Sequence, residues 1–486
     1  MEGPKVIFVS AEATPFIKVG GLADVAGSLP RALRRQGVDV RLILPRYATV
    51  SPRQFGLERL AAIPVPVGTG ETRVHLLGGE VEGLPVYMIW DDQYFSAREK
   101  VYGFNDDAQR FAFFARAVIA ALDYLPWKPD LIHANDWHAA PIVAWLRHYG
   151  RRGDDFFARV ASLFTIHNIA YQGLCGRLIL TFARMQELPH LEVEPPGQVN
   201  WMAQGIANAD IVNTVSPTYA REILEPEAGA GLHTLLRRRH EEGSLYGILN
   251  GLDTELWNPA TDSALPQTFD LHSRHLRRVN KAALQREIGL PVRDNVPLLG
   301  TVTRLDALKG LDILLPALER LLAEGEGQFV ILGTGQPDYE AQLRALQERF
   351  PQQVRALIKF DERMARRIYG AVDLFLMPSR FEPCGLGQMI AMRYGALPLV
   401  RATGGLADTV IDADAAPEQG TGFVFRPYTP EALFDALQRA LHAYAARERW
   451  DAMQVRAMER DFSWDRSARA YADLYEQTLH LVGKGG

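Results

Sequence analysis

The sequence is poor in cysteine, carries little net charge and lacks long apolar runs. Its two cysteines, Cys175 and Cys384, are too few and too isolated for a disulfide framework or a zinc site, as expected in a reducing compartment. The formal net charge of -5 and the scattered basic residues exclude the electrostatic footprint of a nucleic-acid-binding protein. No run of about 18 apolar residues occurs, so we expect no membrane-spanning helix.

The N-terminal segment MEGPKVIFVS also lacks the basic patch, apolar core and cleavage site of a signal peptide. These absences predict a cytoplasmic protein. The chain of 486 residues, 47% of them hydrophobic and 23% charged, has the composition of a globular protein. Its length is enough for two or three domains, each with a full core.

Short apolar runs alternate with helical patterns in both halves of the chain. In the first half we expect a helix over 21–36 and strands in KVIFVSAE, 38–44, LIHANDWH, VASLFTIHN and ADIVNTVSP. In the second half we expect strands in VPLLGTVTRL, QFVILGTG, VRALIKF, VDLFLMP and LPLVRAT. This alternation predicts two doubly wound α/β sheets, which bind ligands at the carboxyl ends of their strands.

The two series are separated by the segment ILNGLDTELWNPATD. Asn250 and Gly251 form a turn dipeptide, Pro259 prevents a continuing helix, and about thirty polar residues follow. We therefore place the domain boundary close to residue 250.

A short repeat connects the two halves. Gly20 and Gly21 begin the sequence GGLAD, which recurs with Gly404 and Gly405. Both copies are expected to follow a strand and to open a helix, where paired glycines let backbone N–H groups approach an anion. The alternative is a coincidental pair of helix-start turns.

Cations and one carboxylate lie near these turns. Lys18 precedes the first glycine pair, and Arg304 and Lys309 follow the first strand of the second series. Such cations can neutralise the negative charge of a diphosphate. The alternative is that they are surface cations that bind no ligand. Glu382, in SRFEPCGLGQ, follows another strand, and the glycines after it expose amide donors. Cys384 has no visible base partner, so we do not expect a nucleophilic thiol.

Polar residues also follow two strands of the first half. The segment HANDWH supplies His133, Asp136 and His138, and TIHNIAYQG supplies His167. The spacing of His133 and His138, in an expected loop, is not that of a helical metal site. Two strand ends that deliver polar residues to one sheet edge favour an active site around Asp136 and His167.

The motifs above, taken together, resemble those of bacterial glycogen synthases and plant starch synthases. The resemblance covers the whole chain and rests on KVGGLADV, VYGFNDDAQRFAFF, HANDWH, TIHNIAYQG, NTVSPTYAREI, ILNGLDTELWNPATD, RLDALKG, PSRFEPCGLGQ and TGGLADTV. It implies a GT-B fold of two Rossmann-like domains facing a deep cleft. Residues 1–249 would form the acceptor side and residues 250–461 the nucleotide-sugar domain. Residues 462–486 would form a helix that packs back on the first domain.

The resemblance also implies roles for single residues. As catalytic residues it implies Glu382, Lys309, Arg304, Asp136 and His167. As donor-binding residues it implies Lys18, Gly20, Gly21, Asn250, Arg304, Lys309, Phe360, Cys384, Gly385, Leu386, Gly404 and Gly405. Among these, Lys18, Arg304 and Lys309 would meet the phosphates and Glu382 the transferred glucose. Gly404 and Gly405 would lie at a helix N-terminus beneath the diphosphate, and Asp136 and His167 on the acceptor side.

Three positions depart from the family pattern. Phe360 stands where the family often has a tyrosine that stacks on adenine, and stacking survives this exchange. Gly387 stands in place of a frequent threonine, and Ala203 in place of a frequent lysine. None of these three positions is among the charged residues expected to contact the diphosphate or the transferred glucose.

The implied reaction is a retaining transfer of glucose from ADP-glucose to the non-reducing 4-OH of an α-1,4-glucan such as glycogen, with no cofactor or metal. UDP-glucose as donor, a plastid-type starch synthase and a non-catalytic glycan-binding protein remain alternatives. A nicotinamide-dependent oxidoreductase would need a full G-x-G-x-x-G motif, which is absent. A phosphorylase would need a pyridoxal phosphate lysine and a much longer chain.

Overall fold

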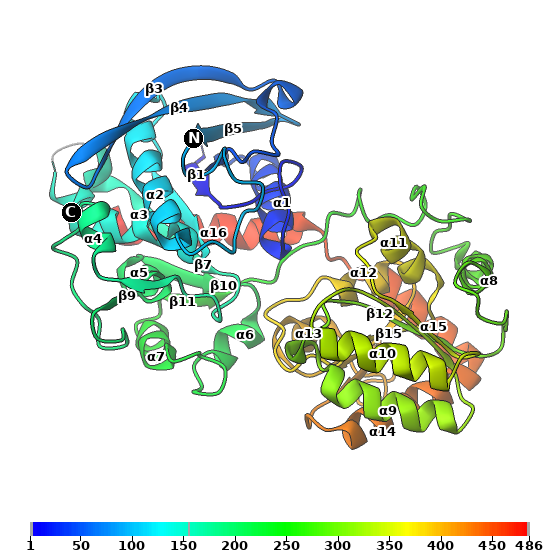
Figure 1. The fold of residues 1–486 in the computed structure, drawn as a ribbon. Helices are drawn as coiled ribbons and strands as arrows, with labels where there is room; N and C mark the ends of the chain where they lie inside the picture. The colour runs from blue at the N-terminus through cyan, green and yellow to red at the C-terminus, as the bar shows by residue number, and fades with distance from the viewer. Residues whose placement is uncertain (1–2, 154–155, 484–486) are drawn as a thin grey trace. The chain divides into compact units, whose positions relative to one another are not determined.

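The structure, a computed structural model, describes residues 3–153 and 156–483. It divides into two compact units (Figure 1). The first runs to Gly251 and resumes at Trp464, and the second spans Leu252–Ser463. The sequence placed these divisions at residues 250 and 462. Each unit is described here by itself.

The described part of the first unit is built on a nine-stranded sheet in the order β11-β10-β7-β6-β1-β2-β5-β4-β3. Its strands are β1 Lys5–Val9, β2 Asp39–Pro45, β3 Glu58–Val67, β4 Gly70–Val81, β5 Leu84–Trp90, β6 Leu131–Asn135, β7 Ala161–Ile166, β10 Ile211–Thr214 and β11 Leu245–Gly247. The strands from β11 to β5 pair in parallel, and β4 and β3 pair antiparallel beyond β5. The sequence did not predict this antiparallel edge. Strands β8 Leu174–Gly176 and β9 Gln198–Asn200 form a separate small sheet.

The chain order of this sheet reverses at β1. From β1 the chain runs to β2 and β5 on one side, and β6, β7, β10 and β11 follow on the other. The carboxyl ends of β1 and β6 therefore flank a topological switch point, where open α/β sheets bind ligands. Strand β1 is a short apolar run with four of its five residues buried, as parallel strands covered on both faces require.

Helices pack on this sheet and include the C-terminal segment of the chain. They are α1 Gly21–Arg35, α2 Asp107–Tyr124, α3 Asp136–His148, α4 Ile179–Phe182, α5 Trp201–Asn208, α6 Pro217–Glu222, α7 His233–Glu241 and α16 Trp464–Gly483. Figure 1 shows α16, coloured red, among the helices of the first unit. Its residues Tyr471 and Tyr475 are buried and bond to Asn213 and His133, and Asp465 pairs with Arg35.

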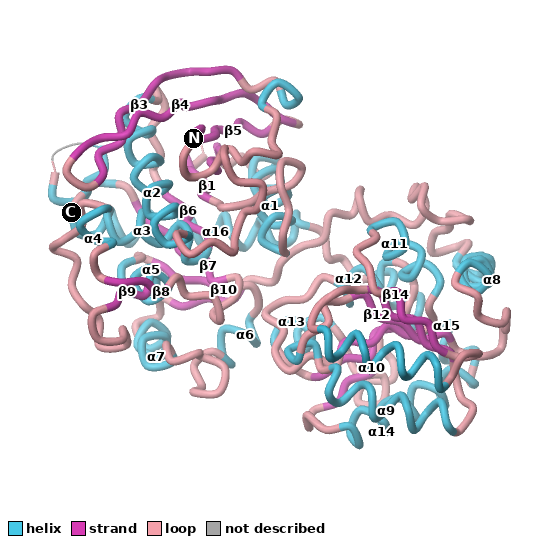
Figure 2. The backbone as a smooth tube through the Cα atoms, viewed as in Figure 1, coloured by secondary structure: helices cyan, strands magenta, loops and turns pink. Residues whose placement is uncertain are grey.

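The second unit contains a six-stranded parallel sheet in the order β14-β13-β12-β15-β16-β17, visible as the magenta strands of that unit in Figure 2. Its strands are β12 Leu298–Val302, β13 Gln328–Leu332, β14 Val354–Leu357, β15 Leu374–Met377, β16 Leu397–Arg401 and β17 Phe423–Phe425. The order reverses between β12 and β15, so the carboxyl ends of these two strands flank the switch point.

The helices of the second unit connect these strands. They are α8 Arg277–Glu287, α9 Leu311–Ala323, α10 Pro337–Arg349, α11 Glu362–Ala371, α12 Gly387–Arg393, α13 Gly404–Thr409, α14 Pro430–Ala445 and α15 Arg447–Glu459. Helix α14 begins where the sequence signals a start, because Thr429 caps it and Pro430 occupies its first position. The polar segment between Pro259 and β12, for which the sequence indicated no element, contains α8. None of the described helices is long and apolar enough to cross a bilayer.

Candidate active site

The first glycine turn begins α1 at the switch point of the first unit. Gly20 caps the helix in an extended conformation with φ of -140°. A Cβ atom on Gly21 would meet nothing within 4 Å, so this turn is open on the side where a side chain would stand. Lys18 lies half-exposed before the turn, and its Nζ is 2.7 Å from Oδ1 of Asp24.

Glu12 is a site residue that the sequence reasoning missed. It is 3% exposed, and its Oε2 accepts hydrogen bonds from the N–H groups of Val19 and Gly20. Burial raises the pKa of its carboxyl. The amides that the sequence assigned to a ligand phosphate are thus partly held by the protein's own carboxylate. The sequence places Glu12 at the end of the expected strand segment KVIFVSAE, but it gives no sign of the amide partners, which lie seven and eight residues further along.

Asp136 and His167 lie at the neighbouring strand ends, as predicted. Asp136 begins α3 with φ of +56°, a conformation that costs a residue other than glycine about 1 kcal/mol or more. Its Oδ1 accepts a hydrogen bond of 2.7 Å from the N–H of His167. The imidazole of His167 lies 2.9 Å from Oδ1 of Asn135, through its Nε2. The strained backbone of Asp136 is therefore held by the end of the next strand.

Burial shifts the pKa of both side chains. It raises the pKa of Asp136 to about 7 and lowers the pKa of His167 to about 3. Near neutral pH, His167 is therefore an uncharged imidazole, and Asp136 exists in both protonation states. A carboxyl of this kind can donate or accept a hydrogen bond to a hydroxyl group.

The other two histidines of this region do not lie in a loop, as the sequence had suggested. His133 is inside β6, fully buried between the hydroxyl groups of Tyr475 and Thr165. His138 is in the first turn of α3 and stacks on Tyr102. The strand and the helix meet without an intervening loop, and both histidines pack in the core of the unit.

We expect Asp136→Asn to change how stability depends on pH. The unfolded carboxyl loses its proton near pH 4, whereas the folded one keeps it up to about pH 7. Between these values the native state binds more protons than the unfolded state, so ionisation of Asp136 lowers the free energy of unfolding as pH rises. The effect is at most on the order of 4 kcal/mol, because the three-unit shift corresponds to 1.36 kcal/mol per unit.

Urea unfolding of both proteins from about pH 4.5 to about pH 7.5 measures this difference. Buried His133, His138 and His167, whose pKa values are lowered, act with the opposite sign over the lower part of this range. They are common to both proteins, so their contribution cancels in the comparison. The variant should gain stability relative to the wild type as pH rises. If the free energies of unfolding of the two proteins change with pH in parallel, the raised pKa of Asp136 is refuted.

In the second unit, Arg304 and Lys309 follow β12 at the switch point. Arg304 is largely exposed, and its guanidinium lies 3.5 Å from Asp306. Lys309 ends a short 3-10 helix, Ala307–Lys309, which the Asp306 side chain caps by accepting from the N–H groups of Leu308 and Lys309. This cap fixes the Lys309 backbone beside the end of β12.

Lys309 and Glu382 form an ion pair, which the sequence did not predict. Lys309 Nζ lies 2.7 Å from Glu382 Oε2, and Ser379 Oγ donates to the same oxygen at 2.9 Å. The Glu382 side chain is 8% exposed and that of Lys309 is 20% exposed. A buried pair of this kind is costly to break, because removing one partner leaves an uncompensated charge.

The second glycine pair differs from the first in what it contacts. Gly404 has φ of +44°, and a Cβ on it would lie 1.9 Å from the carbonyl oxygen of Glu382. The N–H of Gly405 donates to the carbonyl oxygens of Glu382 and Pro383. Gly404 and Gly405 begin α13, as expected, and the N–H of Gly405 is already bonded to the loop, so the predicted place of this helix end beneath a diphosphate remains a prediction. These glycines hold the Glu382 loop close to α13.

The remaining predicted residues of this loop are Cys384, Gly385 and Leu386. No described residue accepts a hydrogen bond from the N–H of Gly385 or Leu386, and both residues are partly exposed. Gly385 has φ of +74°, which favours glycine. Cys384 is buried within the loop. Two amide donors are therefore left for a ligand beside the Lys309–Glu382 pair.

Two predicted donor-binding residues lie apart from these groups within their own units. Phe360 follows β14, and its side chain is 91% exposed. Asn250 is buried at the end of the first unit's main segment, and its Oδ1 accepts no hydrogen bond from a described residue. The ring of Phe360 and Oδ1 of Asn250 are therefore both free to contact a ligand. The donor-binding roles of the two residues remain predictions.

The structure explains the two other departures from the family pattern. A Cβ on Gly387 would lie 3.1 Å from Phe375 and 3.2 Å from the Met377 sulfur, so a threonine would require these side chains to shift. Ala203 is fully buried in α5, where a lysine would need a partner for its charge.

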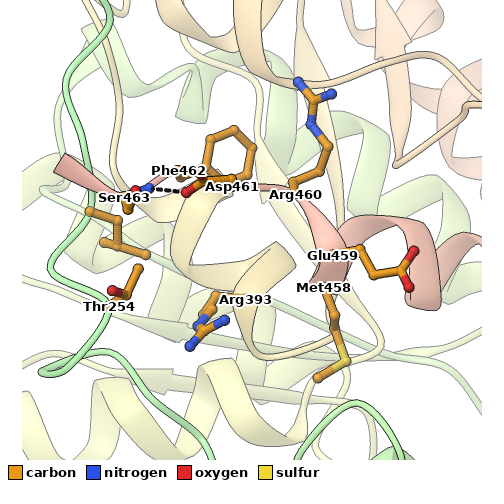
Figure 3. A pocket seen from close by; sticks show the side chains of 9 residues that line it. Thr254, Arg393, Met458, Glu459, Arg460, Asp461, Phe462 and Ser463 are labelled. Carbon is orange, nitrogen blue, oxygen red and sulfur yellow. Dashed lines mark hydrogen bonds between the residues drawn. The ribbon is translucent and has the colours of Figure 1, made fainter. Parts of the chain in front are cut away.

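A pocket in the second unit is lined by none of the predicted site residues. Figure 3 shows its lining around Thr254, Arg393 and the segment 458–463. It has a volume of about 250 Å³ and lies where the chain enters and leaves the unit, beside the hydrogen bond from Leu252 N to Phe462 O. Within residues 3–153 and 156–483, no group of three or more His, Cys, Asp or Glu side chains could hold a metal ion.

Comparisons with known families agree with the predicted resemblance. Residues 5–238 match the family described as starch synthase catalytic domain, and residues 286–454 match glycosyl transferases group 1. A glycogen synthase of Geotalea daltonii is 44% identical, covering 99% of this chain and 100% of the relative. A glycogen synthase of Moorella thermoacetica is 46% identical, covering 98% of this chain and 97% of the relative.

Solved structures show the same fold. The catalytic domain of starch synthase IV from Arabidopsis thaliana, bound to ADP and acarbose, has a TM-score of 0.90 and 37% identity and covers 98% of this chain and 100% of that chain. A sucrose-phosphate synthase of Thermosynechococcus elongatus has a TM-score of 0.62 at 20% identity, with 98% of this chain and 99% of that chain covered, and shows the fold alone. With such identity over its whole length, the chain belongs to the glycogen synthase and starch synthase family of GT-B glycosyltransferases.

Proposed function

We propose that the chain transfers glucose from ADP-glucose to the non-reducing 4-OH of an α-1,4-glucan such as glycogen, with retention of configuration and without a metal or other cofactor. The observation that carries this proposal is the group formed by Lys309, Glu382 and the amides of Gly385 and Leu386. It combines a cation, a carboxylate and unused N–H donors at the switch point of the second unit. A family member with 37% identity binds ADP and acarbose.

Lys309 and Arg304 act on the diphosphate. As the bond from glucose C1 to the diphosphate breaks, negative charge builds on the leaving oxygen, and fixed cations stabilise it. Arg304 is exposed enough to move toward a ligand, whereas Lys309 is held in place by Glu382. Lys18 adds a third cation from the turn before α1 and exchanges its Asp24 partner for phosphate when the donor binds.

Glu382 and the two amides act on the transferred glucose. The carboxylate stabilises the positive charge that develops at C1, and the N–H groups of Gly385 and Leu386 hold sugar hydroxyls. The open turn at Gly20 and Gly21 gives the donor close access to the backbone. Phe360 offers an exposed aromatic face on which adenine can stack.

Asp136 and His167 act on the glucose and acceptor side. The new bond forms between glucose C1 and the acceptor 4-oxygen, and the proton of that hydroxyl passes to the departing diphosphate. His167 is neutral near pH 7, so it orients hydroxyl groups without adding positive charge beside the developing cation. The partly protonated carboxyl of Asp136 can donate or accept as the sugar requires.

The decisive test compares ADP-glucose and UDP-glucose as donors for the purified protein with glycogen as acceptor. We expect ADP-glucose to give a kcat/KM about tenfold or more above that of UDP-glucose, because a purine presents a larger face to Phe360. Chain elongation is followed by incorporation of labelled glucose. A preference for UDP-glucose would refute the donor assignment, and binding of glycogen without elongation would favour a non-catalytic glycan-binding protein.

A further inference from the structure

A second pocket of the second unit has no part in the proposed reaction. It has a volume of about 340 Å³, and its lining is rich in cations, which come from residues 274–281 and from Arg447. Those cations are Arg274, Arg277, Arg278, Lys281 and Arg447. Three carboxylates also line it, those of Asp294, Asp373 and Asp451, so the lining has an excess of positive charge.

This pocket lies at the opposite edge of the sheet from the candidate active site. Asp294 and Asn295 precede β12, and Asp373 precedes β15, so the pocket lies at the amino ends of both strands. Lys309 and Glu382 follow the carboxyl ends of the same strands. The five residues of β12 separate the two edges by roughly 15 Å, at about 3.3 Å per residue. A ligand of the pocket is therefore distinct from the sugar donor.

One cation of the pocket is already neutralised. Lys281 Nζ lies 2.7 Å from Asp373 Oδ2 and also donates to the carbonyl of Val296 and to the hydroxyl of Tyr444. This buried pair fixes the floor of the pocket and leaves Lys281 no donor for a ligand.

The other arginines are not neutralised by a carboxylate. Among the described residues, none forms an ion pair with Arg274, Arg278 or Arg447. Arg278 and Arg447 are exposed, and Arg274 is half-buried. The guanidinium of Arg447 lies 3.9 Å from the ring centroid of Tyr444, which covers the aromatic face and orients the cation at the rim. The pocket therefore offers planar donors rather than an open stacking surface.

Arg277 adds a buried donor with unused capacity. It is 6% exposed, its Nη2 donates to the carbonyl of Val372, and its Nε has no hydrogen-bond partner among the described residues. Burial of this guanidinium is unfavourable and is only partly offset by the nearby charge of Asp373, so a bound anion would relieve part of the cost. A guanidinium binds phosphate well because two of its N–H groups can donate parallel hydrogen bonds to two phosphate oxygens.

We propose that this pocket binds a phosphoryl anion, either inorganic phosphate or the phosphate group of a monoester, through Arg274, Arg277 and Arg278. The volume exceeds that of a single phosphate, so a small polar substituent on the anion can also be accommodated. The site lies outside the catalytic machinery and does not depend on the identity of the sugar donor.

Calorimetric titration of the full chain tests the proposal, with inorganic phosphate and glycerol 3-phosphate as probes at matched ionic strength. We expect both probes to bind the wild type, and the double variant Arg274→Ala/Arg278→Ala to lose about tenfold or more in affinity. Tighter binding of inorganic phosphate indicates that the site takes free phosphate. Tighter binding of glycerol 3-phosphate indicates that it takes a phosphate monoester. The matched control is Arg286→Ala/Arg293→Ala, which removes two nearby exposed arginines that do not line the pocket.

The control variant and Lys309→Ala should bind both probes as the wild type does. The proposal is overturned if the wild type does not bind either probe, if the Arg274/Arg278 variant binds with unchanged affinity, or if only Lys309→Ala abolishes binding. Because Arg278 is exposed, Arg278→Ala alone provides a second variant whose fold is not at risk, and it should show a smaller loss of the same kind.

Discussion

Replacing Lys309 with alanine is expected to lower kcat/KM for ADP-glucose by roughly 10²–10³-fold, the usual effect of removing a preorganised charge that stabilises a leaving group. Steady-state glucan elongation at varied donor concentration measures this loss. The reason is structural, because Lys309 is held at the switch point by the cap at Asp306 and by Glu382, 2.7 Å away. A fixed cation stabilises the departing diphosphate without reorganisation.

A second explanation of such a loss must be separated from the first. Lys309→Ala also leaves the Glu382 carboxylate buried and unpaired, which can displace the loop. The double variant Lys309→Met/Glu382→Gln removes both charges and so restores the local balance. If the orphaned carboxylate destabilises the single variant, the double variant regains stability, but its turnover stays low in either case because the proposed role of Glu382 is lost as well. The role of Lys309 is therefore read from Lys309→Ala itself: a normal free energy of unfolding with low kcat/KM supports action on the diphosphate, and a loss of kcat/KM only in step with lost stability would contradict it.

Gly404→Ala is expected to lower the free energy of unfolding by about 3 kcal/mol, whereas Gly21→Ala should change it by less than about 1 kcal/mol. Gly404 is the first glycine of the second GGLAD copy, and Gly21 is the second glycine of the first copy. Their counterparts differ in the same way, because a Cβ on Gly405 would lie 2.2 Å from the Cys384 carbonyl oxygen and one on Gly20 would lie 3.7 Å from Glu12 Oε1. A Cβ on Gly404 would lie 1.9 Å from the Glu382 carbonyl oxygen, in a backbone with φ of +44°. A Cβ on Gly21 would meet nothing within 4 Å.

Urea unfolding of the two variants beside the wild type measures this contrast, and donor KM provides the functional readout. Gly404→Ala should also lose activity because Glu382 is displaced with its loop. Gly21→Ala should fold normally and raise the donor KM, since the added methyl group fills the open side of the turn. Equal destabilisation by both substitutions would contradict the different roles of the two copies.

The strands could be predicted because each is a short apolar run with a buried environment on both faces. β1 and β12 begin and end close to the expected residues for this reason. The antiparallel β3 and β4 could not be predicted in the same way, since one side of this edge is more exposed and its pattern does not resemble a parallel strand. Helix α8 was missed because its sequence is mostly polar.

For the candidate site, the sequence indicated which polar residues follow the strands but not how they pair. Strand ends identified Asp136, His167, Lys309 and Glu382, because parallel strands deliver their carboxyl ends to one edge. The ion pair of Lys309 with Glu382 joins residues that are 73 positions apart, so no local pattern could reveal it. Glu12 is hidden from pattern reading for a related reason, since its partners are backbone amides.

By itself, the sequence determined the family, the two α/β units and the set of charged residues near the strand ends, because these follow from local apolar periodicity and from recognisable motifs. The tertiary structure decided how the two GGLAD copies differ. One leaves an open turn beside Glu12, and the other holds the Glu382 loop through the Gly405 N–H. Identical local sequences acquire different roles because the contacts that distinguish them come from residues far away in the chain.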